Sequence, residues 1–310
     1  MFPCYYIFNR INICIIAFLN KIIMKKIKKY LPYILILIIV GITFYVWLYV
    51  FENKNPKMLK VAFLDVGQGD AVYIETPNKK QVLIDGGKDS KLLYSLSKVM
   101  PFADRSIDLL VITHRDMDHI GGLPMLLEGY RISKVIDNGL KGETEISNSI
   151  DEKIFNRSIE KEVAQKGMKV VLDKKSNIYL EIIYPDKDVS KLDSNDGSVV
   201  IRLTHGENSF LFTGDAGVYA ESLMLWGESE NNLDVDVLKL GHHGARSSSS
   251  LLWLERTTPE LAIISAGKNN SYGHPHEETI ERLNSLKIPF LSTAELGTIL
   301  IKSDGLGLEY

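Results

Sequence analysis

The chain has 310 residues, of which 45% are hydrophobic and 24% are charged. This length and composition can fill one large core or two smaller ones, which excludes an intrinsically disordered chain. The net charge of −3 conceals two unequal parts, because the first 57 residues hold eight of the 36 basic side chains and one of the 39 acidic ones. The remainder, at about −10, lacks the basic excess that tight, sequence-independent DNA binding normally requires.

The N-terminal part is predicted to cross a membrane. No charged residue lies between Tyr30 and Phe51, and a helix of roughly 22 residues rising about 1.5 Å each spans a hydrocarbon core of about 30 Å. We expect a basic cytoplasmic leader at 1–30 and a transmembrane helix at 31–51, with the domain outside because lysines are more numerous before the helix than after it. Two alternatives stay open: a cleaved signal peptide, which would make the domain secreted, and a start of translation at Met24.

A polar linker at 52–57 leads to a domain predicted over 58–310. Short apolar runs between turn residues predict strands, and apolar positions three or four residues apart predict helices. In chain order, the expected elements are strands at 59–64, 71–74 and 81–84, a helix at 91–100, a strand at 109–113, a charged helix-like segment at 150–165, strands at 178–184, 198–203, 209–213, 235–240 and 261–265, and a helix at 277–286. The domain is therefore strand-rich and of the α/β class.

Four side chains able to bind a metal follow the strand predicted at 109–113. They are His114, Asp116, Asp118 and His119, all within six residues. A pair of glycines shortly after them lets the backbone turn tightly. Such a loop at a strand end can direct ligands toward two neighbouring ions, whereas the alternative is a polar surface loop.

Two further groups of the same kind follow other predicted strands. Asp215 follows the strand at 209–213 behind a glycine, and His242 with His243 follows the strand at 235–240. Alone, an aspartate at a strand end is more typical of a helix cap, and a histidine pair of a solvated turn. Three such groups at strand ends favour one metal-dependent site over three separate structural roles.

Several segments, taken in order, resemble the metallo-β-lactamase fold. The loop from His114 to His119, here called the metal loop, resembles the variant found in the extracellular domain of the ComEC family of competence proteins. This variant has aspartate at position 116, where the more usual form has histidine. The resemblance extends over about residues 59–302 and includes the segments 63–71, 83–87, Asn195 with Ser198, 214–215, 241–244 and 272–275. Together with the N-terminal segment, it implies a four-layer αββα metallo-β-lactamase sandwich, with the active site along one edge, preceded by one transmembrane helix.

The resemblance also implies two divalent metal ions, Zn²⁺ or Mn²⁺, as cofactors. The implied ligands are His114 and Asp116 for one ion, Asp118 and His119 with one of His242 and His243 for the other, and Asp215 between the two. Asn195 lies near where many relatives carry a third histidine, so the first ion is short of a nitrogen ligand. Oxygen-rich coordination favours Mn²⁺ more than an all-histidine site would.

Two divalent ions would activate a water as a bound hydroxide and stabilise negative charge on the substrate, so no side-chain nucleophile is needed. The candidate catalytic residues are Asp118 and His274. His274 would protonate the leaving group or hold the developing negative charge, because Gly273 and Pro275 restrict the backbone on either side of it.

The remaining candidates would support the ligands or contact the substrate. Asp85 would orient a ligand histidine from behind. Asp65 and Asp70 flank a glycine turn, where they would hydrogen-bond the loop under the metals or only form the turn. Ser248 would contact a phosphate, unless the serines at 247–250 only cap the helix that follows. Asn195 belongs to the same group of supporting candidates.

These features predict a metal-dependent phosphodiesterase or nuclease acting outside the membrane. The resemblance suggests DNA as its substrate and DNA uptake as its context. A single transmembrane helix cannot form the multi-helix channel of ComEC-like proteins alone, so a hydrolase of a cell-envelope or small-molecule phosphoester is the alternative. A third hypothesis is a domain that binds a partner without catalysis, and no protein partner can be deduced from the sequence. The name of the fold does not make a β-lactam the substrate.

Overall fold

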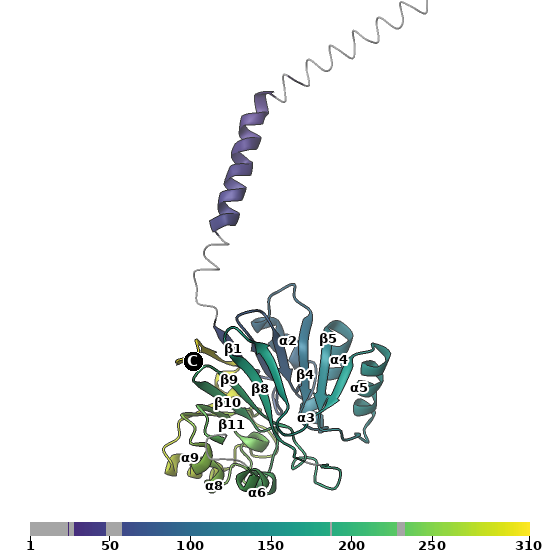
Figure 1. Ribbon diagram of the computed structural model, residues 1–310, viewed down its shortest axis with the longest axis vertical. Helices are drawn as coiled ribbons and strands as arrows, with labels where there is room; N and C mark the ends of the chain where they lie inside the picture. Colours follow the sequence, from purple (N-terminus) through teal and green to yellow (C-terminus); the bar gives the residue numbers. More distant parts are fainter. Residues whose placement is uncertain (1–23, 25–27, 48–57, 187, 228–232) are drawn as a thin grey trace, which may run out of the picture. The chain divides into compact units, whose positions relative to one another are not determined.

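The computed structural model describes residues 24, 28–47, 58–186, 188–227 and 233–310 (Figure 1). The chain divides into two units, Met1–Pro56 and Lys57–Tyr310. In the first unit one helix, Lys28–Trp47, has a mean hydropathy of 2.1 and is long and apolar enough to cross a membrane. Most of the predicted leader, the last residues of the predicted transmembrane helix and the linker at 52–57 lie outside the described residues.

The second unit contains two β-sheets. The first sheet has eight strands, in the spatial order β15 (Leu308–Glu309), β14 (Ile299–Ser303), β1 (Leu59–Phe63), β2 (Val72–Glu75), β3 (Gln81–Ile84), β4 (Ser106–Ile112), β5 (Arg131–Asp137) and β6 (Glu160–Val163). The second has seven, in the order β13 (Phe290–Ser292), β12 (Leu261–Ile264), β11 (Val237–Lys239), β10 (Asn208–Phe212), β9 (Val200–His205), β8 (Ile178–Tyr184) and β7 (Lys169–Asp173). In each sheet an antiparallel part adjoins a parallel part, which runs from β3 to β6 in the first sheet and from β10 to β13 in the second.

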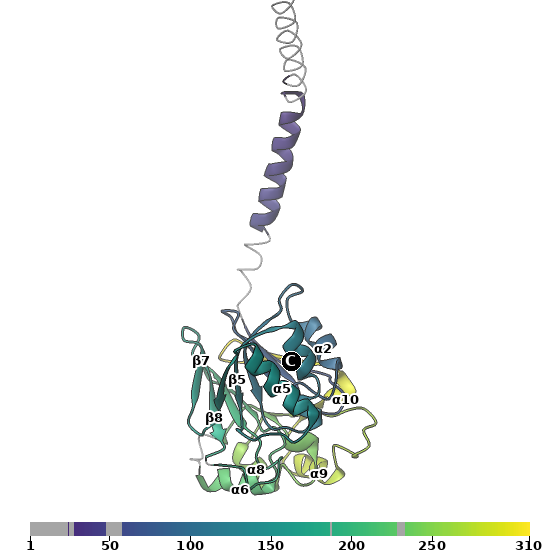
Figure 2. The ribbon, with the colours of Figure 1, turned by 90° about the vertical axis from the view of Figure 1, so that its right-hand side faces the viewer.

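Helices cover the outer face of each sheet, as the two views in Figures 1 and 2 show. On the first sheet these are α2 (Lys91–Val99), α4 (Leu123–Gly129) and α5 (Glu145–Asn156), and on the second α6 (Val218–Gly227), α8 (Leu251–Thr257) and α9 (Glu277–Ser285). The described residues of the unit also form three short elements: α3 (Met117–Ile120), the 3₁₀ turn η1 (Gly241–Gly244) and α10 (Thr293–Leu296).

The core has three layers of apolar side chains, and strand alternation explains how they form. Along β1, Val61 and Phe63 face the layer between the sheets, whereas Ala62 faces the layer under α2, α4 and α5. Phe212 of β10 meets Phe63 in the central layer, with ring centroids 6.0 Å apart. A third layer lies between the second sheet and its helices. The predicted four-layer αββα sandwich is confirmed.

One sequence expectation is wrong in part. The segment at 150–165 is not a single helix, because α5 ends at Asn156 and residues Glu160–Val163 form β6. Ser158 has a left-handed φ of 51°, which a continuous helix cannot accommodate. All four residues of β6 are exposed, so this edge strand lacks the apolar alternation by which a strand is recognised.

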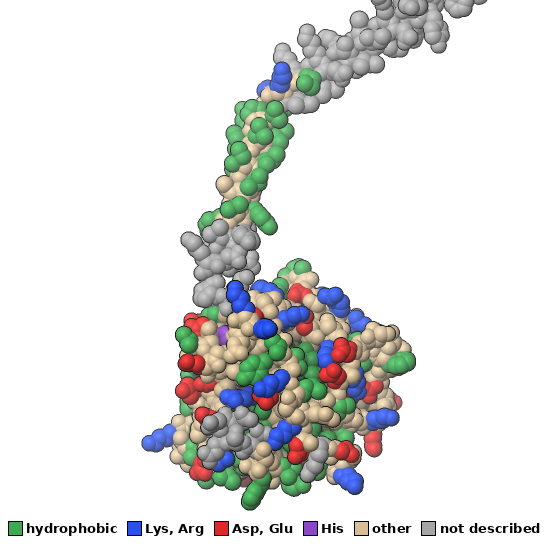
Figure 3. Space-filling view, viewed as in Figure 1, with side chains coloured by type: hydrophobic (Ala, Val, Ile, Leu, Met, Phe, Trp, Pro, Cys, Tyr) green, Lys and Arg blue, Asp and Glu red, His purple; other side chains and the backbone are tan. Residues whose placement is uncertain are grey.

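The domain surface carries charges of both signs. On the face shown in Figure 3, basic and acidic side chains are interspersed, without a broad area of one sign. A pocket lined mainly by side chains of one charge would therefore be unusual on this domain and would indicate a binding site for a ligand of the opposite charge.

Candidate metal centre

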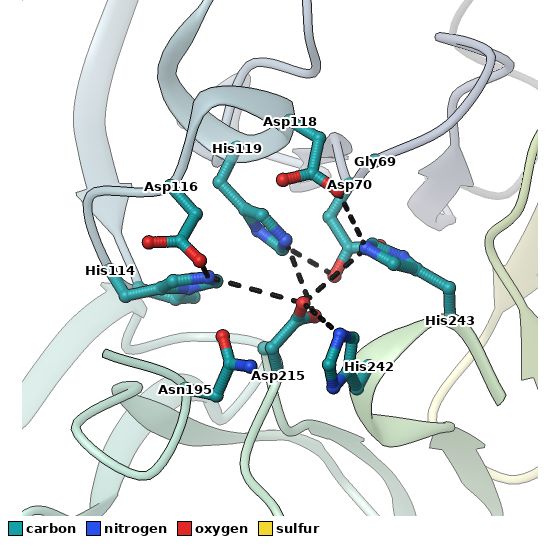
Figure 4. Close-up of polar contacts among 12 residues, drawn as sticks. Gly69, Asp70, His114, Asp116, Asp118, His119, Asn195, Asp215, His242 and His243 are labelled. Atoms are coloured by element: carbon teal, nitrogen blue, oxygen red, sulfur yellow. Dashed lines mark hydrogen bonds and ion pairs between the residues drawn. The ribbon is translucent and has the colours of Figure 1, made fainter. Parts of the chain in front are cut away.

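The predicted ligands come from loops that follow strands of both sheets. The loop after β4 and the short helix α3 supply His114, Asp116, Asp118 and His119 from the first sheet. The second sheet supplies Asp215 after β10 and the pair His242 and His243 in η1, after β11. Figure 4 shows these side chains pointing toward one another. The structure thus brings together every residue that the sequence proposed as a ligand.

Asp215 lies in the middle of the group, buried among histidine rings. Its Oδ1 is 3.3 Å from Nε2 of His119, and its Oδ2 is 3.4 Å from Nε2 of His243. The Nε2 atoms of His242 and His114 lie farther from the same oxygen, at 3.8 and 4.0 Å. One carboxylate therefore faces four imidazole nitrogens.

Asp85 fixes the orientation of His119 from behind. Its Oδ2 lies 2.8 Å from Nδ1 of His119 and also accepts the Thr113 hydroxyl at 2.7 Å, while its Oδ1 accepts the Thr113 backbone N–H at 2.8 Å. Because Nδ1 is directed to Asp85, Nε2 of the ring faces Asp215. The orienting role proposed for Asp85 agrees with this geometry.

The same arrangement directs His114 and His243. The Thr113 hydroxyl donates to Asp85, so its lone pair accepts from Nδ1 of His114, 3.0 Å away. Nδ1 of His243 lies 2.9 Å from the carbonyl oxygen of Ser265. In each buried ring, Nδ1 bonds to the protein and Nε2 is left facing the centre.

His242 and His243 are adjacent in sequence but play unequal parts. His243 is buried and its Nε2 lies 3.1 Å from Oδ2 of Asp118, whereas His242 has a side chain 29% exposed. Both have left-handed backbones, with φ of 47° and 57°, and this turn directs both rings toward Asp215. The structure therefore pairs His243, and not His242, with Asp118.

Asp70 supports the centre through a buried ion pair. Its carboxylate pairs with the ammonium group of Lys239 and lies 3.2 Å from Nδ1 of His243. The atoms of Asp70, His119, Asp215 and His243 that could bind a metal all lie within 4.8 Å of one another. Because Asp70 faces the Nδ1 side of the rings and already has a cation beside it, we place it behind the ligands.

A glycine lets the loop of Asp70 approach the metal loop. Gly69 has φ of +121°, and a Cβ on it would lie 2.0 Å from the carbonyl oxygen of Asp118. The backbone N–H of Asp70 donates to that same oxygen at 3.2 Å. Any larger residue at position 69 would displace the metal loop.

The donor set fits a divalent metal ion. Nε2 of His114, Nε2 of His119 and Oδ1 of Asp215 are buried without a hydrogen-bond partner among the described residues. Buried polar atoms are normally hydrogen-bonded, so unpaired ones that face one another are suited to bind a cation. Imidazole and carboxylate groups suit zinc, and carboxylates also suit manganese.

Burial and mutual attraction set the charges of these groups. Burial raises the pKa of Asp215, but His243 and His119 outweigh this effect and hold that pKa well below its usual value. Burial lowers the pKa of His119 and of His243, yet Asp215 and other carboxylates raise both well above the usual value. Burial lowers the pKa of His114 to about 4. A metal ion would therefore compete with protons at two of these rings.

The other predicted ligands and supporting residues lie at the edge of the centre. Asp116 is 44% exposed, its Oδ2 lies 3.8 Å from Nε2 of His114, and its Oδ1 accepts the Ser194 hydroxyl at 2.7 Å. Oδ1 of Asn195 is buried and has no hydrogen-bond partner among the described residues. Its side chain points toward the same group in Figure 4.

Two supporting candidates have structural partners in place of a substrate. Asp65 accepts the backbone N–H of Gly67 at 3.1 Å and pairs with Lys91 at 2.6 Å, which makes it a turn residue. Ser248 is buried, and its hydroxyl donates to the carbonyl oxygens of Gly241 and Ala245 at 2.6 and 3.0 Å. Ser248 therefore holds the turn that carries His242 and His243, here called the histidine turn. Because its hydroxyl is buried and bonded, Ser248 cannot make the phosphate contact proposed for it.

His274 lies beside the histidine turn. Its ring centroid is 5.4 Å from that of His242, and its Nδ1 lies 3.5 Å from Nε2 of Gln68. Asn270 fixes the loop, since its side chain accepts the backbone N–H of His274 at 3.0 Å and donates to its carbonyl oxygen at 2.6 Å. Burial, followed by the neighbouring histidines, lowers the pKa of His274 to about 4.

Sequence reasoning missed two buried cations. Lys239 ends β11, and its ammonium group also donates to the carbonyl oxygens of Gly214 and Leu240 at 3.1 and 2.9 Å. Arg115 pairs with Asp137 and, at 3.1 Å, with Asp151, which ties the metal loop to β5 and α5. Two features of the sequence could have identified them. Lys239 interrupts an otherwise apolar strand, and Arg115 lies between two predicted metal ligands.

Comparison with known proteins decides the family. The profile of the metallo-beta-lactamase superfamily matches residues 64–268, which include the metal loop, Asp215 and the histidine turn. The chain belongs to the metallo-beta-lactamase superfamily. Its ligand loops therefore occur in the context that the sequence resemblance implied, and the superfamily fold with this buried cluster supports a metal-dependent hydrolase.

Curated relatives within this superfamily include competence proteins. ComE operon protein 3 of Bacillus subtilis is 32% identical over 260 residues, which are 77% of this chain and 32% of that protein. Recombination protein 2 of Haemophilus influenzae is 29% identical over 260 residues, 81% of this chain and 30% of that protein. Competence protein ComA of Neisseria gonorrhoeae is 28% identical over 244 residues, 77% and 31% of the two chains. This superfamily member thus spans about a third of the length of these relatives.

Solved structures match the domain at low sequence identity. The fold protein YhfI from Bacillus subtilis has a TM-score of 0.52 at 12% identity, over 79% of this chain and 100% of its own. The metallo hydrolase Igni18 from Ignicoccus hospitalis has a TM-score of 0.51 at 18% identity, over 78% of this chain and 98% of its own. These two matches support the two-sheet fold.

Proposed function

We propose that this superfamily member is a metal-dependent phosphodiesterase that acts on nucleic acid outside the membrane in which its N-terminal helix anchors it. The observation that carries the proposal is the convergence of three buried Nε2 atoms on Asp215, each ring being held from behind at Nδ1. Divalent ions bound there would supply an activated water and stabilise the negative charge that develops on a phosphoester.

The ligands divide into two groups around Asp215, which supports a pair of ions. Asp118, His119 and His243 form a nitrogen-rich group, in which Asp118 lies 3.1 Å from His243. His114, Asp116 and Asn195 form an oxygen-rich group. Hard oxygen ligands suit Mn²⁺ and imidazole suits Zn²⁺, so we assign the two groups different metal preferences.

His274 is assigned to holding the charge that develops on the substrate. Oε1 of Gln68 accepts the backbone N–H of Gly267 at 3.2 Å, so its amide N–H group faces Nδ1 of His274. With Nδ1 as acceptor, the proton of the neutral ring sits on Nε2 and is available as a donor. Because its pKa is lowered to about 4, His274 is neutral near pH 7, which favours charge stabilisation over protonation of the leaving group.

The substrate class and location rest on separate support. The relatives include a competence protein and a recombination protein, names that point to nucleic acid. The excess of lysines before the helix Lys28–Trp47 favours a cytoplasmic N-terminus and a domain on the other side of the membrane.

The test uses the whole chain in detergent with Mn²⁺ or Zn²⁺. Single- and double-stranded DNA, bis-p-nitrophenyl phosphate and phosphorylcholine esters serve as substrates. Asp118→Asn should abolish DNA cleavage, because it removes a charged ligand of the nitrogen-rich group, whereas Asp186→Asn, an exposed aspartate outside the centre, should retain it. Turnover of the small esters alone would contradict the nucleic-acid substrate and select the envelope or small-molecule phosphoester. Absence of both turnover and metal uptake would select a non-catalytic binding domain.

A further inference from the structure

An open pocket lies beside Gln68, a residue that contacts His274. It has a volume of about 520 Å³ and is lined by three lysines, Lys88, Lys91 and Lys268, together with Gln68, Asn270 and other residues of the neighbouring loops. We call it the lysine pocket. The metal mechanism described above uses none of these three lysines.

Gln68 connects the lysine pocket to the metal centre. It lines the pocket, and its Nε2 lies 3.5 Å from Nδ1 of His274. His274 in turn packs against the ring of His242, with centroids 5.4 Å apart. Gln68 therefore lies between His274 and the pocket, and Asn270, which bonds the His274 backbone, lines the pocket as well.

Two of the three ammonium groups are available to a ligand. Lys91 pairs with Asp65 at 2.6 Å. Lys88 and Lys268 are exposed and have no ion pair with a carboxylate in the part of the chain that the structure describes. Asp89, the other acid of the pocket, accepts the backbone N–H of Lys91 at 2.8 Å. The pocket thus presents a net positive charge on a domain that is acidic as a whole.

The backbone that carries Lys88 is fixed against the metal loop. Gly86 donates its N–H to the carbonyl oxygen of His119 at 2.6 Å, and Gly122 donates to the carbonyl oxygen of Gly87 at 3.1 Å. A Cβ on Gly121 would lie 1.9 Å from the carbonyl oxygen of Lys88, so the two loops are in close contact. The position of Lys88 relative to the metal ligands is therefore set by the fold.

We propose that the lysine pocket binds a phosphate group of the substrate other than the one that is cleaved. Ammonium groups bind phosphates as point charges, and a cleft of one sign concentrates oppositely charged ligands. The inference rests on the proposed phosphodiesterase function and narrows its substrate to chains with more than one phosphodiester. A single-stranded nucleic acid has this chemistry, whereas an isolated phosphoester does not.

The test compares two double variants of the whole chain in detergent. Lys88→Gln/Lys268→Gln removes the two available ammonium groups, and Lys174→Gln/Lys175→Gln removes two exposed lysines from the turn between β7 and β8. Binding of a fluorescent oligothymidylate is measured by anisotropy in EDTA. The pocket variant should bind about tenfold more weakly, with a salt slope smaller by about 0.7 for each lost phosphate contact, while the control variant should match the unmodified protein.

Hydrolysis gives an independent readout. With metal, the pocket variant should lose about tenfold in kcat/KM on the oligothymidylate and nothing on a dinucleotide with a single phosphodiester. Equal losses in both double variants, or equal losses on both substrates, would overturn the lysine pocket and leave the phosphodiesterase function standing. Lysine-dependent binding without any cleavage by the unmodified protein would refute the phosphodiesterase function and leave the phosphate site standing.

Discussion

Replacing Lys239 by methionine tests the buried ion pair under the metal centre. The Lys239 side chain is 2% exposed and that of Asp70 is 3% exposed. The ammonium group satisfies Asp70 and the carbonyl oxygens of Gly214 and Leu240, so its three donors are all used. Lys239→Met keeps the volume of the side chain but leaves the Asp70 carboxylate without its nearest cation.

The expected loss of stability is large. Removing one partner of a buried ion pair costs about 3–5 kcal/mol, because the remaining charge stays desolvated. The double variant Asp70→Asn/Lys239→Met removes both charges, so it should recover about half of that loss. The stability recovered measures the part of the loss that comes from the unpaired Asp70 carboxylate. The loss that remains comes from the carbonyl oxygens of Gly214 and Leu240, which have lost their donor.

The pH dependence gives a second signature. In the unmodified protein burial raises the pKa of Asp70, but Lys239 and His243 outweigh burial and lower it. The ionised carboxylate therefore contributes stability that is present above its unfolded pKa of about 3.9 and is lost as pH falls through the folded value. Lys239→Met removes the charge that does most to counter the effect of burial, so the pKa of Asp70 should rise. The variant should therefore gain stability as pH falls through this raised pKa.

Urea unfolding of the whole chain in detergent and EDTA, followed by tryptophan fluorescence to which the buried Trp253 contributes, measures these differences between about pH 5 and pH 8. A single variant within about 1 kcal/mol of the unmodified protein would refute the reasoning. So would a double variant that is no more stable than Lys239→Met, or a single variant whose stability rises toward acid pH no more steeply than that of the unmodified protein.

Three further predictions concern metal binding. Asp85→Asn turns an amide N–H group toward Nδ1 of His119 and should weaken metal affinity about 10- to 100-fold in competition with a chromophoric chelator; unchanged affinity would contradict the orienting role. Because the pKa values of His119 and His243 are raised, metal uptake near pH 7 should release protons and weaken as pH falls. Calorimetry in buffers of different ionisation enthalpy checks this, and a heat independent of buffer would count against it. Asn195→His adds a nitrogen ligand and should shift the bound Zn²⁺ to Mn²⁺ ratio toward zinc about tenfold by elemental analysis, whereas an unaltered ratio would exclude Asn195 as a ligand.

The sequence predicted the elements that carry ligands because those ligands are close together in the chain and follow apolar strands. The loop from His114 to His119 is local information, and it directly follows a buried strand, β4. The choice between His242 and His243 depends on two consecutive left-handed residues, which nothing in the local pattern announces. The sequence alone therefore left this pair open.

Contacts between distant segments escaped the sequence for a different reason. The partner of Lys239 is Asp70, which lies in the other sheet's half of the domain, and Nδ1 of His243 is bound by a backbone carbonyl that any residue could provide. The strand β6 was missed because its residues are exposed and charged and it holds its place by pairing with β5. Such features arise from tertiary packing and carry no periodic signal.

The two halves of the sandwich meet at the metal centre, and this has a mechanical consequence. His119 follows a strand of the first sheet and Asp215 follows a strand of the second. An ion bound by both residues would therefore cross-link the two sheets. Nearby, the N–H of Val199 donates to the carbonyl oxygen of Thr113 at 2.9 Å, a bond that also crosses between them. Withdrawal of the ions should then raise hydrogen exchange at Val199 first, while each sheet keeps its own ladder. Metal binding would then stabilise the packing of the two sheets against each other in addition to supporting hydrolysis.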